Sequence, residues 1–203
     1  MKYILTTVAV FVCATATYAA GPVGFGVQAT AANVNFEGPL KEIYGFGFGG
    51  GAHLDINFLP IVSLRVQGDY VSFSPDKGKF AALLANSAGV PASDISVDGG
   101  RVNFISANAN VKVDVAPLPI LSPYVTGGAG ITSFSTSDLT VQYQGTPVAA
   151  TKQDSQTKFS ANLGIGTELD LVAVKLYLEA RYTWIFTEGS TSTYIPVSLG
   201  VTL

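Results

Sequence analysis

The chain has 203 residues, a formal net charge of −3 and only 12% charged residues, which fits one domain and argues against a nucleic-acid-binding protein. Its mean hydropathy of +0.38 is high for a soluble domain. Yet after residue 20 no stretch approaches the roughly 18 consecutive apolar residues of a membrane-spanning helix. Apolar residues that alternate with polar ones explain both observations, because each strand then has one face of each kind.

The N-terminal segment has the pattern of a secretory signal. Lys2 precedes an apolar run over residues 3–12, and small residues follow. We expect cleavage after Ala19, with Ala20 as the alternative. The mature domain then covers residues 20–203.

Cys13 lies within this signal segment and raises the alternative of a lipoprotein. However, the bulky Val12 occupies the position at which lipoprotein signals carry a small residue. Removing residues 1–19 removes the only cysteine, so the mature chain cannot form a disulfide. We therefore expect strand pairing to hold the domain together.

Eight segments of the mature chain alternate apolar and polar residues with the period of a β-strand. They cover residues 22–32, 43–57, 62–73, 101–115, 124–134, 158–171, 175–186 and 193–203. The clearest is 175–186, which has aromatic residues at the end of its apolar face and Glu179 and Arg181 on its polar face. Its alternation is longer than an ordinary strand and suits a tilted strand that crosses a bilayer, which needs roughly 9–11 residues.

The segment between the third and fourth strands, residues 74–100, contains a different period. Apolar residues within 79–88 fall on one helical face. Asp76 is placed to cap the helix, and Gly89 with Pro91 supplies a stop signal. We expect a short helix here, and a polar loop in the other long connection over residues 135–157.

Short and long connections alternate along the chain, and the number of strands is even. This layout is typical of an up-and-down barrel, in which the first and last strands lie together and can pair. Closure matters because an open sheet edge in lipid leaves backbone groups without partners. The predicted fold is all-β: a closed eight-stranded antiparallel up-and-down transmembrane β-barrel with a short helix in the second outer loop.

Alternation alone does not decide which face meets lipid, since a soluble lipocalin-like barrel is apolar inside. The polar faces are rich in glycine, which suits the crowded interior of an eight-stranded barrel. The charged residues expected in the lumen are Asp55, Arg65, Asp69, Lys112, Asp114, Glu168, Asp170, Glu179 and Arg181. They form either an ion path or a structural charge network that fills the lumen, and the narrow barrel favours the network. The aromatic residues expected at the outer membrane interface are Tyr44, Tyr70, Phe134, Phe159, Trp184 and Tyr194.

Two further motifs are better explained by the barrel than by chemistry. Gly45, Gly47 and Gly50 match a dinucleotide-binding GxGxxG pattern, but they lie within a strand pattern and no helix follows. His53 and Asp55 share one face, but no serine motif accompanies them, and one histidine does not make a metal site. We therefore expect no enzyme, no catalytic residue, no cofactor and no metal.

Four stretches carry a family resemblance: PYVTGGAGI at residues 123–131, NLGIGTELDL at 162–171, LYLEARYTW at 176–184 and the closing YIPVSLGVTL. They resemble the small outer-membrane β-barrel family, the eight-stranded type related to the OmpA barrel and OmpX. The family's last strand usually ends in an aromatic residue, whereas this one ends in Leu203.

The resemblance implies a porin-like cell-envelope protein, integral to the outer membrane of a Gram-negative-type bacterium. It implies contact with outer-membrane lipid and lipopolysaccharide, and recognition of the C-terminal strand by the barrel-assembly machinery. The expected role is structural and surface-displaying, with loops that can meet an extracellular or host ligand. The alternative is a narrow OmpW-like channel for small or apolar solutes.

Overall fold

The computed structural model describes residues 22–35, 43–116, 118, 120–171, 174–187 and 190–203. Within them the elements are β1 (Val23–Asn35), β2 (Tyr44–Leu59), β3 (Val62–Pro75), α3 (Lys77–Ala88), the 3-10 turn η2 (Ala92–Asp94), β4 (Ile95–Gly99), β5 (Val102–Asp114), β6 (Leu121–Tyr143), β7 (Thr146–Leu171), β8 (Val174–Thr187) and β9 (Ser190–Thr202). The predicted signal segment and its cleavage after Ala19 lie outside the described residues. No helix in the described part of the chain is long and apolar enough to cross a bilayer.

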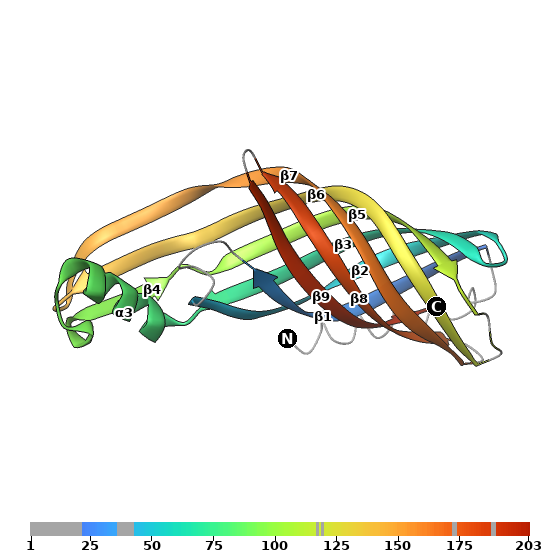
Figure 1. Cartoon of the computed structure of the whole chain (residues 1–203), viewed down its shortest axis with the longest axis horizontal. Helices are drawn as coiled ribbons and strands as arrows, with labels where there is room; N and C mark the ends of the chain where they lie inside the picture. The colour runs from blue at the N-terminus through green and yellow to red at the C-terminus, as the bar shows by residue number, and fades with distance from the viewer. Residues whose placement is uncertain (1–21, 36–42, 117, 119, 172–173, 188–189) are drawn as a thin grey trace, which may run out of the picture.

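Eight strands form a closed antiparallel ring, as the sequence predicts. Neighbours run in the order β1, β2, β3, β5, β6, β7, β8 and β9, and β9 pairs back with β1. Leu203 takes part in this closure, because its N–H donates to the carbonyl of Phe25 at 2.8 Å and its own carbonyl accepts from the Phe25 N–H at 3.2 Å. Figure 1 shows the strands tilted around the ring. A tilted, closed sheet is the geometry that satisfies every strand without leaving an edge.

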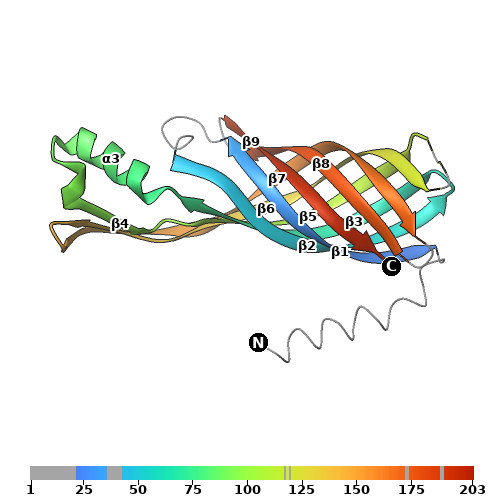
Figure 2. The same cartoon turned by 90° about the horizontal axis from the view of Figure 1, so that it is seen from below.

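A long projection extends from one end of the ring, where the sequence predicted loops. Beyond the ring, β6 and β7 continue as a hairpin that turns at Gln144 and Gly145, whose φ angles are 49° and 80°. β4 pairs with the outer end of β6, and α3 packs on β4. We call residues 77–99 and 137–158 the arm, and Figures 1 and 2 show it reaching away from the ring. The prediction of a polar loop over residues 135–157 is therefore wrong, because this Ser-, Thr- and Gln-rich sequence forms paired strands.

The predicted helix over residues 79–88 is confirmed as α3, which begins two residues earlier, at Lys77. The Asp76 carboxylate accepts from the backbone N–H groups of Gly78 at 3.0 Å and Lys79 at 3.1 Å. The helix ends at Gly89, which has the left-handed φ of 69°. Capping at one end and a glycine stop at the other explain why this polar connection contains a helix.

Most outward side chains of the ring are apolar and its buried charged side chains point inward, which confirms that the apolar strand faces are outside. Ile165 and Leu199 point outward and are 67% and 62% exposed, whereas Thr132 and Ser160 point inward and are 0% exposed. This is the reverse of a soluble protein, which buries its apolar side chains in a core. The arrangement is stable where lipid surrounds the ring.

Large aromatic rings on the inner face lie directly across the ladder from glycines. Tyr124 pairs with Gly166 between β6 and β7, and Tyr177 pairs with Gly200 between β8 and β9. A Cβ on Gly166 would collide with the Tyr124 ring, and a Cβ on Gly200 would lie 2.5 Å from Cζ of Tyr177. The glycines therefore provide the space into which the two rings fold across the neighbouring strands.

We expect Gly166→Ala to destabilise the barrel by about 1–3 kcal/mol, because the added methyl group overpacks the lumen against Tyr124. The control is Gly68→Ala on the outer face, where the new Cβ meets only the Ser106 carbonyl oxygen at 3.9 Å. The measurement is the free energy of unfolding in urea for protein folded into lipid vesicles. Equal stability of the two variants would contradict this account of the glycines.

We expect Leu178→Arg to prevent or strongly weaken membrane assembly. Leu178 points outward in β8 and is 50% exposed, and an arginine near the bilayer midplane costs about 2–4 kcal/mol. Phe58→Arg, next to the β2–β3 turn, is the control, because the same charge near the membrane surface costs only about 0–1 kcal/mol. The readout is the fraction of protein that shifts mobility on heating in SDS. If both variants assemble equally, the outer face of β8 is not a lipid face.

Candidate functional site

Arg65 is the centre of the polar half of the lumen. It is 1% exposed and lies directly across the β2–β3 ladder from Asp55. Its Nε and Nη2 donate to the two carboxylate oxygens of Asp55 at 2.7 and 2.8 Å. On the far wall its guanidinium reaches Glu168 at 3.4 Å and Glu179 at 3.5 Å, and the Tyr177 ring stacks 4.7 Å from its Cζ. One planar cation therefore joins β3 to its neighbour β2 and to β7 and β8 on the far wall.

Lys112 neutralises the same acidic group from β5. Its Nζ lies 2.6 Å from Oε1 of Glu168 and 3.8 Å from Oδ1 of Asp114. The Tyr124 ring lies 5.0 Å from this ammonium, and the Tyr124 hydroxyl donates to Oε2 of Glu179 at 2.9 Å. The carboxylates of Glu168 and Glu179 are thus each held by more than one donor.

Arg181 continues the network toward the outer end of the ring. It lies 3.1 Å from Glu179 and 3.5 Å from Asp69. Asp69 also accepts hydrogen bonds from the amides of Gln28 and Gln67, both at 2.6 Å. The carboxylate of Asp69 therefore binds amides as well as a cation.

At the opposite rim, Lys175 lies 3.2 Å from Asp170 and 3.9 Å from Glu168. All nine charged residues that the sequence placed in the lumen are thus brought into one connected set, which we call the lumen network together with Lys175. The sequence analysis did not name Lys175 or the uncharged members Gln28, Gln67, Tyr124 and Tyr177 as site residues. Polar residues on the same strand faces were the available signal, but their pairing depends on the stagger of the strands.

His53 belongs to the same polar half. Its ring nitrogens lie 3.0 Å from Oε1 of Gln28 and 2.9 Å from Oγ1 of Thr202, and its Nε2 is 3.9 Å from Asp55. The Tyr177 ring lies edge-on at 5.3 Å. The histidine is 2% exposed and hydrogen-bonded on both sides, so it fills space in the lumen.

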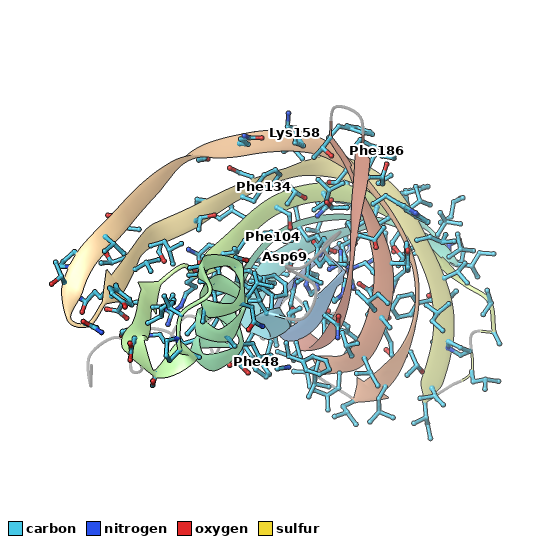
Figure 3. All side chains as sticks on the ribbon, turned by 60° about the vertical axis from the view of Figure 1, so that its left-hand side comes forward. Phe48, Asp69, Phe104, Phe134, Lys158 and Phe186 are labelled. Carbon is cyan, nitrogen blue, oxygen red and sulfur yellow. The ribbon has the colours of Figure 1, made fainter. Side chains whose placement is uncertain are left out.

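The outer half of the lumen is apolar, which the sequence analysis did not predict. Phe104 packs against Phe73 at 5.1 Å, Tyr194 at 5.4 Å and Phe134 at 6.2 Å between ring centres. Ile43, Val71, Val102 and Ile185 complete this aromatic layer with Ala32, Val34 and Tyr44. Figure 3 shows Phe104 and Asp69 inside the ring and Phe48 and Phe186 outside it.

Three of the six aromatic residues predicted at the membrane interface point inward instead. Tyr44 precedes an irregularity in the β2–β3 ladder before Gly47, which reverses its facing, and its hydroxyl donates to the Gly100 carbonyl at 2.6 Å. Phe134 shares the inner face of β6 with Thr132, and Tyr194 shares that of β9 with Ser198. Each lies two or four residues from an inward-pointing residue of its own strand, so its strand position decides its facing.

The other three aromatic residues lie on the outer face. Tyr70 and Phe159 are 47% and 56% exposed, and Phe159 stacks on Phe186 at 5.8 Å. Trp184 packs against the outward Tyr182 at 4.8 Å. Their role at a membrane interface stays a prediction.

A cavity of about 300 Å3 lies above the aromatic layer, at the end of the ring that bears the arm. Most of its wall comes from the ring, and the arm contributes Phe80 of α3 and Leu139 of β6. The lining residues are Tyr44, Phe80, Gly100, Val102, Phe104, Phe134, Thr136, Leu139, Ile185, Thr187 and Ser192. The lumen therefore has three levels: the lumen network, the aromatic layer and this mouth cavity.

Comparisons with solved structures agree with the ring. Neisserial surface protein A superposes with a TM-score of 0.54 at 19% identity, covering 90% of this chain and 97% of that one. Ail of Yersinia pestis, solved with the heparin analogue sucrose octasulfate, gives 0.51 at 13% identity over 89% and 97%. OprG of Pseudomonas aeruginosa gives 0.51 at 10% identity over 89% and 93%. These likenesses show a shared fold.

A comparison with curated proteins finds no match. The model of the outer membrane protein beta-barrel domain family, however, matches residues 5–202, which is nearly the whole chain. The closed ring, the apolar outer face and the polar lumen are what such a domain requires. The chain belongs to the outer membrane protein beta-barrel domain family and is an integral outer-membrane protein.

Proposed function

We propose that this protein is a closed-lumen barrel with a structural and surface-display role and no enzymatic activity. The lumen network carries this proposal, because it fills the polar half of the ring from wall to wall. Arg65 alone bridges Asp55 on β2 to Glu168 and Glu179 on β7 and β8. An eight-stranded barrel is just wide enough to be filled by its side chains, so such a bridge leaves no wide path.

The arm is the part suited to display. Short turns and both ends of the barrel domain lie at one end of the ring, and the arm extends from the other, which is the layout of periplasmic and outer sides. Lys77 and Asp98 join α3 to β4 at 2.6 Å, and the Lys77 ammonium holds the pKa of Asp98 below its usual range. Both side chains are exposed, so this pair joins two elements within the arm and contributes little to the stability of the fold.

The partners follow from this placement. The outward strands meet outer-membrane lipid, and the outer rim meets lipopolysaccharide. We include in the proposal an extracellular or host ligand for the arm, and recognition of β9 by the barrel-assembly machinery. Ail has been solved with a heparin analogue, which supports testing sulfated polysaccharides on this arm first.

A narrow channel for small or apolar solutes is the second candidate. The mouth cavity favours it, because it provides an apolar site at the outer end of the lumen. The aromatic layer and the lumen network oppose it, since both lie between that cavity and the periplasmic end. Conductance decides between the two candidates.

We expect Arg65→Ala to destabilise the barrel by about 3–5 kcal/mol, because it leaves buried carboxylates without their cation. It should also raise single-channel conductance in planar bilayers from a closed wild type. The control is Lys175→Ala, whose side chain is 46% exposed at the rim and should change stability by about 1 kcal/mol or less. Steady conduction by the wild type, unchanged in Arg65→Ala, would instead support the channel.

We expect Gln144→Cys to be labelled in intact cells by a membrane-impermeant maleimide, because Gln144 is exposed at the tip of the arm. With Cys13 in the expected signal segment, the added residue is the only cysteine of the mature chain. Leu59→Cys, at the β2–β3 turn, is the matched control and should react only after the outer membrane is opened. Labelling of Leu59→Cys and protection of Gln144→Cys in intact cells would invert the proposed orientation.

A further inference from the structure

The mouth cavity is built from parts of the chain that are far apart in sequence. β2 contributes Tyr44, α3 contributes Phe80, β6 contributes Phe134 and Leu139, and β9 contributes Ser192. The Asp76 N–H at the start of α3 donates to the Ile43 carbonyl at 2.8 Å, which ties the helix to the wall of the cavity. Phe80 is thus held over the mouth by the capped end of its own helix.

The described residues close the cavity at its base and leave it open toward the outer side. Phe73, Phe104 and Tyr194 pack with ring centres 5.1 and 5.4 Å apart and are at most 5% exposed, so they form a floor. Phe80 and Leu139, in contrast, keep partial exposure. A molecule that enters from outside therefore meets a dead end.

The chemistry of the lining selects neutral ligands. Among the residues that the structure describes, none of those that line the cavity carries a charge. Aromatic and aliphatic side chains form most of the wall, and Thr136, Thr187 and Ser192 are the hydroxyl-bearing side chains other than Tyr44 in the described lining. A charged ligand would lose its hydration here without gaining an ionic partner from the described lining, whereas an apolar ring has little hydration to lose.

The size of the cavity excludes a polypeptide. Its volume of about 300 Å3 is roughly twice that of an apolar cavity known to hold benzene, and lies at the small end of ligand pockets. An α-helix, which is roughly 10 Å wide with side chains, does not fit. The geometry points to a binding site for a small uncharged molecule of one or two aromatic rings, held between Phe80, Phe104 and Phe134. This inference goes beyond the display role and does not depend on it.

The test is photolabelling of the folded protein in lipid nanodiscs with trifluoromethyl-diazirinyl benzyl alcohol, a neutral probe with one ring and one hydroxyl. Light expels nitrogen from the diazirine, and the resulting carbene inserts into a nearby C–H bond. We expect saturable labelling of peptides that contain Phe80, Phe104 or Phe134, displaced by excess naphthalenemethanol. The corresponding benzoic acid probe should label these peptides less strongly, by a factor of about ten or more.

Filling the cavity should abolish the saturable labelling. Leu139→Trp places a larger side chain in the cavity and should reduce it by about ten-fold or more. Ile131→Trp, on the outer face of the same strand and 53% exposed, is the matched control and should leave it unchanged. If Leu139→Trp does not show the heat-dependent mobility shift of a folded barrel, Ser192→Phe, which fills the cavity from β9, replaces it in the experiment.

Three results in nanodiscs alone would overturn the site: equal labelling by the acid probe, labelling confined to outward residues without saturation, and saturable labelling that survives both filling variants. If saturable labelling is present in lipid-free amphipol but absent in nanodiscs, a lipid acyl chain occupies the cavity in the membrane. This result would also overturn the proposed site. Labelling of Tyr124, below the aromatic floor, would leave the site standing but contradict the closed lumen.

Discussion

The need to pair every backbone group in lipid governs this structure. A membrane offers no water to an unpaired N–H or carbonyl, so the sheet must close on itself. Closure through β1, β9 and Leu203 then fixes which side of each strand is inside, because side chains alternate along a strand. Once the outer face is apolar for lipid, every remaining residue of the ring must find its partners within a narrow tube.

The tube is filled in two different ways along its axis. In its lower part, charged side chains form ion pairs, and Arg65 and Lys112 neutralise Glu168. A side-chain amide also donates a hydrogen bond to Asp69. Its upper part packs aromatic rings, as in a soluble core. The division follows from solvation: carboxylates deep in the tube are stable only when paired, whereas an apolar layer needs no partner. Glycines opposite Tyr124 and Tyr177 make the large rings of the lower part fit.

Much of this arrangement could be predicted from the sequence, because period-two alternation reports strand number and facing directly. The nine lumen charges follow from their strand faces. Their pairing does not, since Arg65 meets Glu168 only through the stagger of strands 103 residues apart. Tyr44 was placed outside because a ladder irregularity is not visible in a sequence. The arm was taken for a loop because residues 135–157 pair through Ser, Thr and Gln rather than through apolar alternation.

The lumen network and the aromatic layer occupy different levels of the ring, and this separation affects how such a barrel can acquire new roles. The lumen network ties several strands together, so a change at Arg65 or Glu179 acts on many contacts at once. The mouth cavity lies above it and is lined by Phe80 and Leu139 of the arm and by strand ends. Substitutions at Phe80 or Leu139 can therefore alter the shape of the mouth while the lower part keeps the ring closed. A rigid, charge-filled base thus allows the outer end to change its surface without loss of the fold.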